Sequence, residues 1–451
     1  MFNIFNAKSV AIIGASRDPK KLGHVVLENM LHGYKGATYP INPEASFILG
    51  KKCYQSILST DDKIDLAVVM TPAKTVPGII GECARKGVKT AIILSVGFGE
   101  IGNHKSEGLI MKAKKKMRIL GPNCIGVYDS YSKIDTIFTT PQRQGRPGHG
   151  GISFISQSGA FGAILMDLLA SEGIGLAKFI SIGNRIDIDE SEALEYLRND
   201  NETKTIALYI EGVKNGRNFF NVLKKTAKQK PVIVMKAGRT GAGIEAVSSH
   251  TGTLAGHSKI FSAVFKQSHA IEATKIEDLG DFSKIFASQP FPKGKRVQII
   301  TNGGGLGILC IDELEKKQLK IAKLAEKTIK HIEKNVPAYV SVSNPMDLSG
   351  DATTERFELA IETCLKDKNT DALVIAILLQ ISAVQSNIVD VIINAKKHKK
   401  PIVVCSIGGD FTTKHKKLLE QHDIPTYPTP QRAIKSLQAL MKYAEYKGVI
   451  K

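Results

Sequence analysis

The first part of the chain alternates short apolar runs with amphipathic segments, and this alternation limits the fold more than any other feature. The opening run, Ser9–Gly14, breaks at a glycine, as a buried parallel strand does before a loop and a helix. Four more runs follow at 37–43, 66–70, 90–94 and 118–123. Strands that alternate with helices form a doubly wound parallel sheet, and ligands bind at the carboxyl ends of its strands. We therefore expect a ligand site where these runs end, at Ser16, Thr71, Gly97 and Asn123.

Two later regions look like copies of one plan. Segment 152–162 resembles 297–307, because each has an apolar strand, a small polar loop and the start of a helix. Segment 181–188 resembles 341–348, and 230–235 resembles 400–405. A repeat of this kind indicates a repeated structural unit. The sequence thus predicts an α/β protein with a Rossmann-like domain over 1–127, a turn-rich linker over 128–150, and two flavodoxin-like doubly wound domains over 151–289 and 294–451.

Composition excludes several classes of protein. The six cysteines are scattered without a CxxC pair, so we expect neither a disulfide framework nor a cysteine metal site. The chain opens without a basic leader and has no apolar run of the ~18 residues that a membrane span needs. The expectation is a soluble cytoplasmic protein without a metal. The net charge of +19 comes from dispersed lysines with only 6% aromatic residues, a pattern that fits small anionic ligands better than nucleic acid.

Three loops have the form that binds phosphate. Segments 14–23, 156–162 and 302–307 each lead from a strand into a helix through small residues, so backbone N–H groups and the helix dipole converge on one point. Such loops also serve close packing, and this reading stays open for each of them. The first loop lacks the full G-x-G-x-x-G pattern, and no acid ends the second strand at 39–43. A nicotinamide dehydrogenase is therefore the weaker interpretation.

His250 is the candidate nucleophile. It lies among small residues in the segment 248–256, before a helical pattern, and we expect an open loop that leaves the imidazole accessible. An accessible ring nitrogen can attack a phosphoryl group and carry it covalently. The alternative is an ordinary loop histidine near a helix start.

Five motifs then occur in one order: Gly14-Ala15-Ser16, GPNCIG at 121–126, SQSG at 156–159, SHTG at 249–252 and NPMDL at 344–348. Together they resemble the alpha subunits of ADP-forming acetyl-CoA synthetases, in the succinyl-CoA synthetase superfamily, over essentially the whole chain. The resemblance implies a CoA-binding domain, a phosphohistidine domain and a ligase domain. It implies that acetate or a related acid, CoA and ATP interconvert with acyl-CoA, ADP and phosphate through an acyl phosphate and a phosphohistidine.

The resemblance also implies roles for particular residues. His250 carries the phosphoryl group, and Glu211 orients its ring and selects the tautomer. The two phosphate-binding helix starts are Ser156, Gln157, Ser158, Gly159 and Ala160, and Gly303, Gly304 and Gly305. The CoA-binding residues are Gly14, Ala15, Ser16, Lys20, Lys21, Asn42, Thr71 and Asn123. Asn123 contacts CoA or the acyl group near the thiol, or only shapes a turn. Cys124 has no basic neighbour in the sequence, so we interpret it as a packing residue and not as a thioester nucleophile.

The three predicted domains leave no room for an ATP-grasp domain, which would bind ADP or ATP with Mg²⁺. The resemblance therefore implies a separate ATP-grasp beta subunit and an α2β2 heterotetramer. The alternative function is a CoA-binding regulatory or acyl-transfer protein without ligase activity. The pairing of His250 with Glu211 argues against it, because a binding module needs no nucleophile.

Overall fold

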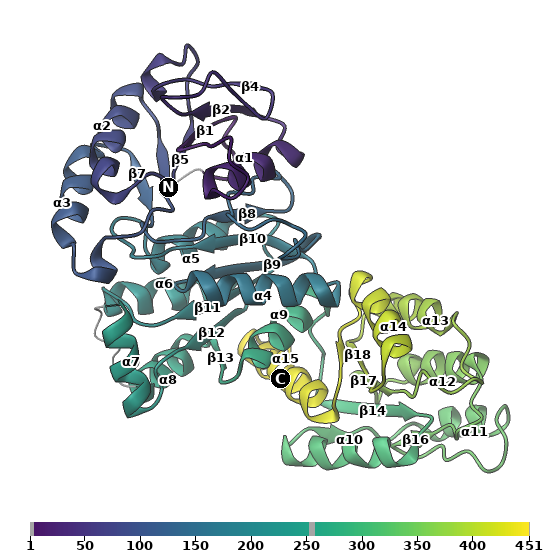
Figure 1. The fold of residues 1–451 in the computed structure, drawn as a ribbon. Helices are drawn as coiled ribbons and strands as arrows, with labels where there is room; N and C mark the ends of the chain where they lie inside the picture. Colours follow the sequence, from purple (N-terminus) through teal and green to yellow (C-terminus); the bar gives the residue numbers. More distant parts are fainter. Residues whose placement is uncertain (1–3, 252–257, 451) are drawn as a thin grey trace. The chain divides into compact units, whose positions relative to one another are not determined.

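The computed structural model describes residues 4–251 and 258–450, without the side chains of 248–251. The chain forms two compact units (Figure 1). The first contains Met1–Ser171 and Gly175–Thr274, and the second contains Glu172–Ile174 and Lys275–Lys451. The predicted α/β architecture is confirmed, since each described sheet of more than two strands is parallel or nearly so.

The first unit opens with a five-stranded parallel sheet. Its strands are β1 (Ser9–Ile13), β2 (Ala37–Ile41), β5 (Leu66–Val69), β6 (Thr90–Ile93) and β7 (Arg118–Leu120), in the order β2-β1-β5-β6-β7. A two-stranded ribbon of β3 (Phe47–Ile48) and β4 (Lys51–Lys52) follows β2. Helices α1 (Leu22–Gly33), α2 (Val76–Lys86) and α3 (His104–Ala113) connect the strands. The apolar runs are fully buried in β1, β5 and β6, as strands covered by helices on both faces require.

A second sheet in the same unit has the order β13-β12-β11-β9-β10-β8. These strands are β8 (Val127–Asp129), β9 (His149–Ser156), β10 (Leu176–Ser181), β11 (Thr205–Ile210), β12 (Val232–Lys236) and β13 (Ile271–Ala273). Helices α4 (Gly159–Glu172), α5 (Glu190–Asn199), α6 (Gly216–Gln229), α7 (Gly241–Thr251) and α8 (Ser258–Ser268) connect them. One cluster of buried apolar side chains includes residues from both sheets, such as Ile12 and Leu208, and this shared core holds the first unit together.

The segment predicted as a linker contributes to the second sheet. Strand β8 pairs antiparallel with β10, and β9 already begins at His149. The 128–150 stretch lacks a helical or alternating pattern because most of it runs as irregular chain between these two strands. Strand β8 has only three residues, which is too short for periodicity to reveal it.

The second unit has a parallel sheet in the order β15-β14-β17-β18-β19, with β16 also beside β14. The strands are β14 (Arg296–Thr301), β15 (Lys320–Ile321), β16 (Met346–Asp347), β17 (Ala372–Ala376), β18 (Ile402–Cys405) and β19 (Thr426–Tyr427). The helices are α9 (Ile276–Ser288), α10 (Gly304–Lys316), α11 (Glu326–Glu333), α12 (Thr354–Lys366), α13 (Ile388–Asn394), α14 (Asp410–Gln421) and α15 (Pro430–Tyr446).

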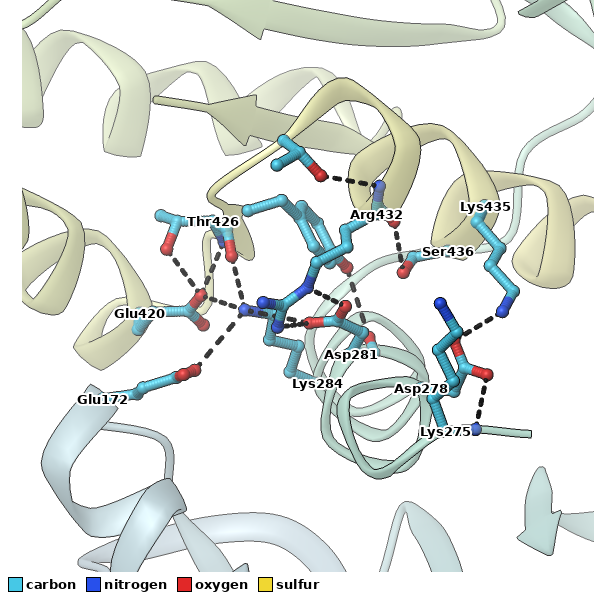
Figure 2. A network of polar contacts seen from close by, with 12 residues as sticks. Glu172, Lys275, Asp278, Asp281, Lys284, Glu420, Thr426, Arg432, Lys435 and Ser436 are labelled. Atoms are coloured by element: carbon cyan, nitrogen blue, oxygen red, sulfur yellow. Dashed lines mark hydrogen bonds and ion pairs between the residues drawn. The ribbon is translucent and has the colours of Figure 1, made fainter. Parts of the chain in front are cut away.

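Helix α9 packs against α15, and buried charges join it to both α14 and α15 (Figure 2). Lys284 donates to Glu420 Oε1 at 3.0 Å, and their side chains are 3% and 5% exposed. Arg432 donates two hydrogen bonds to Asp281, at 2.6 and 2.8 Å. Burial alone would lower the pKa of Lys284, but the carboxylates of Glu420 and Asp281 outweigh burial and raise it. This helix, which the sequence assigned to the end of the 151–289 domain, is therefore an integral part of the second unit.

Strand register tests the predicted repeat residue by residue. Across the neighbouring strands, Ser156 faces Tyr209 and Tyr209 faces Met235, while Thr301 faces Ala376 and Ala376 faces Cys405. The predicted matches of 152–162 with 297–307 and of 230–235 with 400–405 are therefore confirmed. The third match is wrong by six positions, because Ser181 faces Ser156 whereas Asp347 faces Thr301. The SxxNxxD motif, which occurs in both segments, therefore lies at different structural positions in the two copies.

Within the described ranges, no helix combines the length and apolar character that crossing a bilayer requires. The same residues contain no cluster of three or more His, Cys, Asp or Glu side chains able to hold a metal ion.

Candidate active site

A cavity of about 1040 Å³ lies in the first unit, at the carboxyl ends of strands from both of its sheets. Residues that follow β5, β6 and β7 line it from the first sheet, and residues that follow β9, β10 and β11 line it from the second. Carboxyl-terminal strand ends are where open parallel sheets bind ligands. The cavity therefore joins the two crevices that the sequence predicted separately. Its predicted lining residues are Thr71, Asn123, Gln157, Ser158, Gly159, Ala160 and Glu211.

The loop after β1 lies beside the N-terminus of α1. Gly14 has a φ of +94°, and a Cβ on Gly23 would lie 1.9 Å from the Gly14 carbonyl oxygen, so both positions require glycine. Asn42 Nδ2 donates to the Ala15 carbonyl at 2.7 Å and fixes the loop. Gly14, Ala15, Ser16, Lys20, Lys21 and Asn42 are not among the cavity-lining residues, whereas Leu22 of the same segment is. Lys20 and Lys21 are exposed.

Helix α4 begins at the cavity. Ser156 Oγ donates to the Ser158 carbonyl at 2.6 Å, and the Phe161 N–H donates to Ser158 Oγ at 3.3 Å. The helix lies close to its surroundings, because a Cβ on Gly159 would lie 2.6 Å from the Ile125 side chain. The first N–H groups of a helix have no partner inside it, and the dipole adds positive potential there. Ser158, Gly159 and Ala160 thus place the start of α4, with its positive potential, at the cavity wall.

Gln157, which the sequence assigned to phosphate, turns its side chain toward the end of β11 instead. Its Oε1 accepts from the N–H groups of Glu211 at 2.6 Å and Gly212 at 3.2 Å. Its Nε2 donates to the Gly212 carbonyl at 2.7 Å. Because the carboxamide is 8% exposed and bonded on both sides, its contribution in this structure is to hold the backbone that carries Glu211.

Glu211 follows the last residue of β11 and is 8% exposed. Lys236, which ends the neighbouring strand β12, lies within its electrostatic reach. Burial lowers the pKa of Lys236, and the charge of Glu211 opposes that change. A carboxylate oxygen at this position can accept a hydrogen bond from an imidazole N–H.

His250 belongs to helix α7. The backbone of the helix is described to Thr251, so the expectation of an open loop at this position is wrong. Helix α7 lies against the short helix η3 (Gly99–Ile101), whose Gly99 and Glu100 line the cavity. The helix that carries His250 therefore lies next to the cavity wall. The imidazole itself and the rest of the predicted segment to 256 lie outside the described residues.

The third predicted loop belongs to the second unit. Gly303, Gly304 and Gly305 lead from β14 into α10, and Asn302 Oδ1 accepts from the Leu378 N–H at 2.8 Å. By register, Asn302 is the counterpart of Gln157 and Leu378 that of Glu211. The second copy thus repeats the loop and the side-chain clamp, but it has an apolar residue where the first copy has the acid.

Cys124 also lines the cavity, and its chemistry supports the packing interpretation. Its thiol donates to the Ile93 carbonyl at 3.4 Å, and the residue is 3% exposed. Burial raises its pKa to about 12. The thiol is therefore protonated near neutral pH and is a poor nucleophile.

Sequence reasoning missed several polar residues of the wall. Asn184, Arg185 and Lys214 come from the loops after β10 and β11, and Glu100 and Glu107 come from η3 and α3. Segment 181–188 stood out only as part of the repeat, and nothing in its letters marks a site. The signal is three-dimensional for Asn184, because it meets Asn123 and Glu100, which are 61 and 84 residues away.

Three family models match the chain in sequence: a CoA binding domain over 8–130, a succinyl-CoA ligase-like flavodoxin domain over 149–286 and a ligase-CoA domain over 297–450. The alpha subunit of acetate–CoA ligase [ADP-forming] II from Pyrococcus furiosus is 40% identical, over 98% of each chain. The 4-hydroxybutyrate–CoA ligase [ADP-forming] of Nitrosopumilus maritimus is 33% identical over 98% of this chain and 64% of its own length.

A solved structure gives the same result in three dimensions. It is the dinucleotide-forming acetyl-coenzyme A synthetase 1 of Candidatus Korarchaeum cryptofilum, in complex with phosphate and ADP. It is 35% identical, with a TM-score of 0.92 over 99% of this chain and 97% of that one. Sequence, fold and cavity agree: the chain belongs to the family of alpha subunits of ADP-forming acyl-CoA ligases.

Proposed function

We propose that this chain interconverts a small carboxylic acid and CoA with the acyl-CoA, and that His250 carries the phosphoryl group between the acid and a nucleotide. The observation that carries the proposal is the single cavity that brings together Asn123 of the CoA-binding half, the start of α4 and Glu211. An acyl transfer to a thiol through an acyl phosphate needs these three functions within reach of one another.

The reaction consists of two displacements. A carboxylate oxygen of the acid attacks the phosphorus of phosphohistidine, the P–N bond breaks, and an acyl phosphate forms. The CoA sulfur then attacks the carbonyl carbon, the C–O bond breaks, phosphate leaves, and the thiol proton passes to solvent. The N–H groups at the start of α4 stabilise the negative oxygens in both steps, and Glu211 orients the imidazole.

The residues that follow the strands of the first sheet support the CoA assignment. Apolar residues such as Leu94 and Ile125, together with Thr71 and Asn123, line a channel-sized cavity that suits a pantetheine arm. The exposed Lys20 and Lys21 beside the glycine-rich loop after β1 offer charges for the phosphates of the nucleotide end.

Acetate is the default acid, because the more similar relatives are named for it. A relative that is named for 4-hydroxybutyrate makes a longer acid the alternative. A panel of acids, assayed for ADP release by the complete enzyme, decides between them through kcat/KM. Acetate is rejected if a longer acid exceeds it at least tenfold.

We further propose that a separate ATP-grasp beta subunit supplies ATP or ADP with Mg²⁺, in an α2β2 complex. The relatives named as subunit alpha support a second subunit. This chain alone is then expected to take no label from ATP, and the mixture with its partner is expected to take it.

Labelling tests the phosphohistidine directly. The complete enzyme is incubated with [γ-³²P]ATP, and acid-labile, base-stable label on this chain is the expected result. His250→Asn should abolish the label, whereas His331→Asn, a change at an exposed histidine of α11, should retain it. Equal labelling of the wild type and His250→Asn would rule out the proposal.

A further inference from the structure

The loop Gly183–Arg185, which follows β10, is fixed against the turn that carries Asn123. The Asn184 N–H donates to the Pro122 carbonyl at 2.9 Å, and the Ile186 N–H donates to the Gly121 carbonyl at 3.3 Å. Gly183 has a φ of +53°, and a Cβ there would lie 2.2 Å from the Pro122 oxygen. The backbone can approach so closely only because this residue is glycine. The side chains of the two residues that follow are thereby placed on the cavity wall.

Asn184 faces two carboxylates on one side. Its Nδ2 donates to Glu100 Oε2 at 2.6 Å and to Glu107 Oε1 at 3.0 Å. Burial opposes ionisation of Glu100, but hydrogen bonds from Asn184 and from backbone N–H groups outweigh it and lower the pKa of Glu100. Ionised carboxylates only accept hydrogen bonds, so they fix which end of the Asn184 amide faces them.

The orientation of the Asn184 amide determines the orientation of the Asn123 amide. Asn184 Oδ1 has to face the other way, where it accepts from Asn123 Nδ2 at 3.2 Å. The amide of Asn123 is therefore oriented with its nitrogen toward Asn184. Its Oδ1 is left to accept from an N–H or S–H group in the cavity, and both groups occur at the reactive end of CoA. The two glutamates thus set the orientation of Asn123 through one intermediate side chain.

Arg185 acts on the opposite wall. Its Nη1 donates to the Gly212 carbonyl at 2.9 Å and to Glu190 Oε2 at 3.1 Å. The same carbonyl accepts from Gln157, so the residue after Glu211 is bonded through its carbonyl to two side chains. Strand β11 ends at Ile210, so Glu211 and Gly212 lie beyond the last residue of the strand. Gln157 bonds to the backbone of both residues, and Arg185 bonds to that of Gly212.

A gain in the free energy of unfolding does not explain the buried pair of Arg185 and Glu190. Arg185 and Glu190 are 5% and 0% exposed, and Arg185 Nε and Glu190 Oε1 are buried without a partner. A buried ion pair with unsatisfied atoms costs free energy relative to apolar packing. The bonds that Arg185 makes point to a geometric role at this position.

The internal repeat provides an independent comparison. In the second unit, Asn302 clamps Leu378 as Gln157 clamps Glu211. Among the described residues, no arginine or lysine side chain bonds to Leu378 or Leu379 there. The clamp is common to both copies of the fold. By register, Asp351 and Arg356 correspond to Arg185 and Glu190, and they also pair, at 2.9 Å. Among the described residues, the bond from the arginine to the clamped segment is present only in the first copy, where the clamped residue is an acid.

We infer that Asn184 and Arg185 are positioning residues that set both ends of the cavity from one loop: Asn184 orients Asn123 for the step that involves the thiol, and Arg185 holds Glu211 for the steps that involve His250. This inference rests on the proposed function. It extends it by linking two half-reactions to two adjacent side chains.

Two labelling reactions of the complete enzyme separate these roles. Label from [γ-³²P]ATP needs Glu211 and His250, whereas label from acetyl-CoA with ³²P-phosphate, without nucleotide, also needs the thiol step. Asn184→Ala should slow the second reaction at least about tenfold and leave the first within about twofold, since small misplacements of reacting groups cost up to ~10²-fold. Arg185→Met should slow both at least about tenfold, and Arg185→Lys, which keeps a donor and a charge, should recover part of the loss.

Matched controls come from helix α5. Arg198→Met removes another buried arginine that is paired with a glutamate, and Asn199→Ala removes an asparagine that bonds only to a carbonyl. Both should label as the wild type does. CoA affinity of each variant, measured by calorimetry, shows whether it is folded.

The outcomes distinguish the two proposals. An unlabelled wild type overturns the proposed function. A labelled wild type with Asn184→Ala equally slow or equally fast in both reactions overturns the role of Asn184. Arg185→Met at wild-type rate overturns the role of Arg185. If Arg185→Met has lost CoA affinity, only the Arg185→Lys variant is used to judge the role of Arg185. The role is overturned if Arg185→Lys labels at the wild-type rate or if this variant is also unfolded.

Discussion

Cys124 shows at the scale of one residue how position sets chemistry. Its neighbour Asn123 has an amide oriented by Asn184, while the Cys124 thiol points to a backbone carbonyl and is buried. The sequence places these two residues side by side at the end of a predicted strand, and it correctly assigns Cys124 to packing because no basic residue is near it in the chain. The Asn184–Glu100 contact that orients Asn123 has no counterpart in the sequence pattern, because it depends on side-chain geometry between two domains.

The buried thiol predicts low reactivity of Cys124. With a pKa of about 12, its thiolate fraction near pH 7.5 is below about 10⁻⁴. Folded protein should therefore leave Cys124 unalkylated by iodoacetamide over hours, and unfolded protein should react within minutes, as peptide mass spectrometry can follow. Rapid alkylation of the folded chain, or an acyl group found on Cys124 after incubation with acyl-CoA, would show that the packing assignment is wrong.

Glu100 predicts a pH dependence of stability. Its pKa is lower in the folded chain than in the unfolded chain, because hydrogen bonds to its carboxylate outweigh burial. Its stabilising contribution is therefore complete above the unfolded pKa of about 4.5 and is lost as pH falls through the lower, folded pKa. The difference in melting temperature between wild type and Glu100→Gln should be present at pH 7 and shrink below pH ~4.5. A difference that grows with acid would contradict the assignment.

Secondary-structure elements were the most predictable scale. The glycine-terminated apolar run identified β1, and the strands β2, β5, β6 and β7 fall within the other four predicted runs. The pattern is clearest for β1, β5 and β6, because buried parallel strands are continuously apolar. Two of three repeat segments align by register. Helix α7 was mistaken for a loop around His250, because small residues give no apolar period there. Helix α9 lies in the predicted 151–289 domain in sequence, but its side chains bond to α14 and α15, at partners 136 to 157 residues away that no local pattern reveals.

The buried network of α9 predicts a non-additive pair of substitutions (Figure 2). Lys284→Met leaves Glu420 buried without its cation and should destabilise the second unit by about 3–5 kcal/mol. Lys284→Met with Glu420→Gln removes both charges and should recover part of that loss. Urea unfolding, monitored by hydrogen exchange in α9, measures the free energy of unfolding of the double variant and of both single variants. A double variant as unstable as the sum of the two single variants would contradict the ionic coupling.

At the scale of the whole molecule, the order of the motifs in the sequence was enough to predict the fold class and the family. The coordinates were needed to show which of the two units contains each candidate site residue. The cavity, Glu211 and the start of α4 all belong to the first unit, and the third predicted anion loop belongs to the second. Register then shows that the second copy has Leu378 where the first has Glu211. The repeat that is visible in the sequence is therefore a repeat of the fold, but the second copy has no acid at the position of Glu211.

This division predicts where CoA protects the chain. Ligand binding stabilises the native state by about 2.7 kcal/mol at 100 times the Kd. Hydrogen exchange with saturating CoA should slow in β1, β5 and the loops around Thr71 and Asn123, and it should be unchanged in β14 and β17. NADH should protect neither set. Protection that is confined to the second unit would remove the CoA site from the first sheet.

The measurement that tests the central claim most directly is nucleotide-free labelling of the complete enzyme with acetyl-CoA and ³²P-phosphate. If one cavity joins the thiol, the acyl phosphate and the histidine, label should appear on this chain, CoA should be released in equal amount, and both should vanish in His250→Asn and fall steeply in Glu211→Gln. Label that is absent from a complex competent in ATP labelling, or label that survives His250→Asn, would contradict the account.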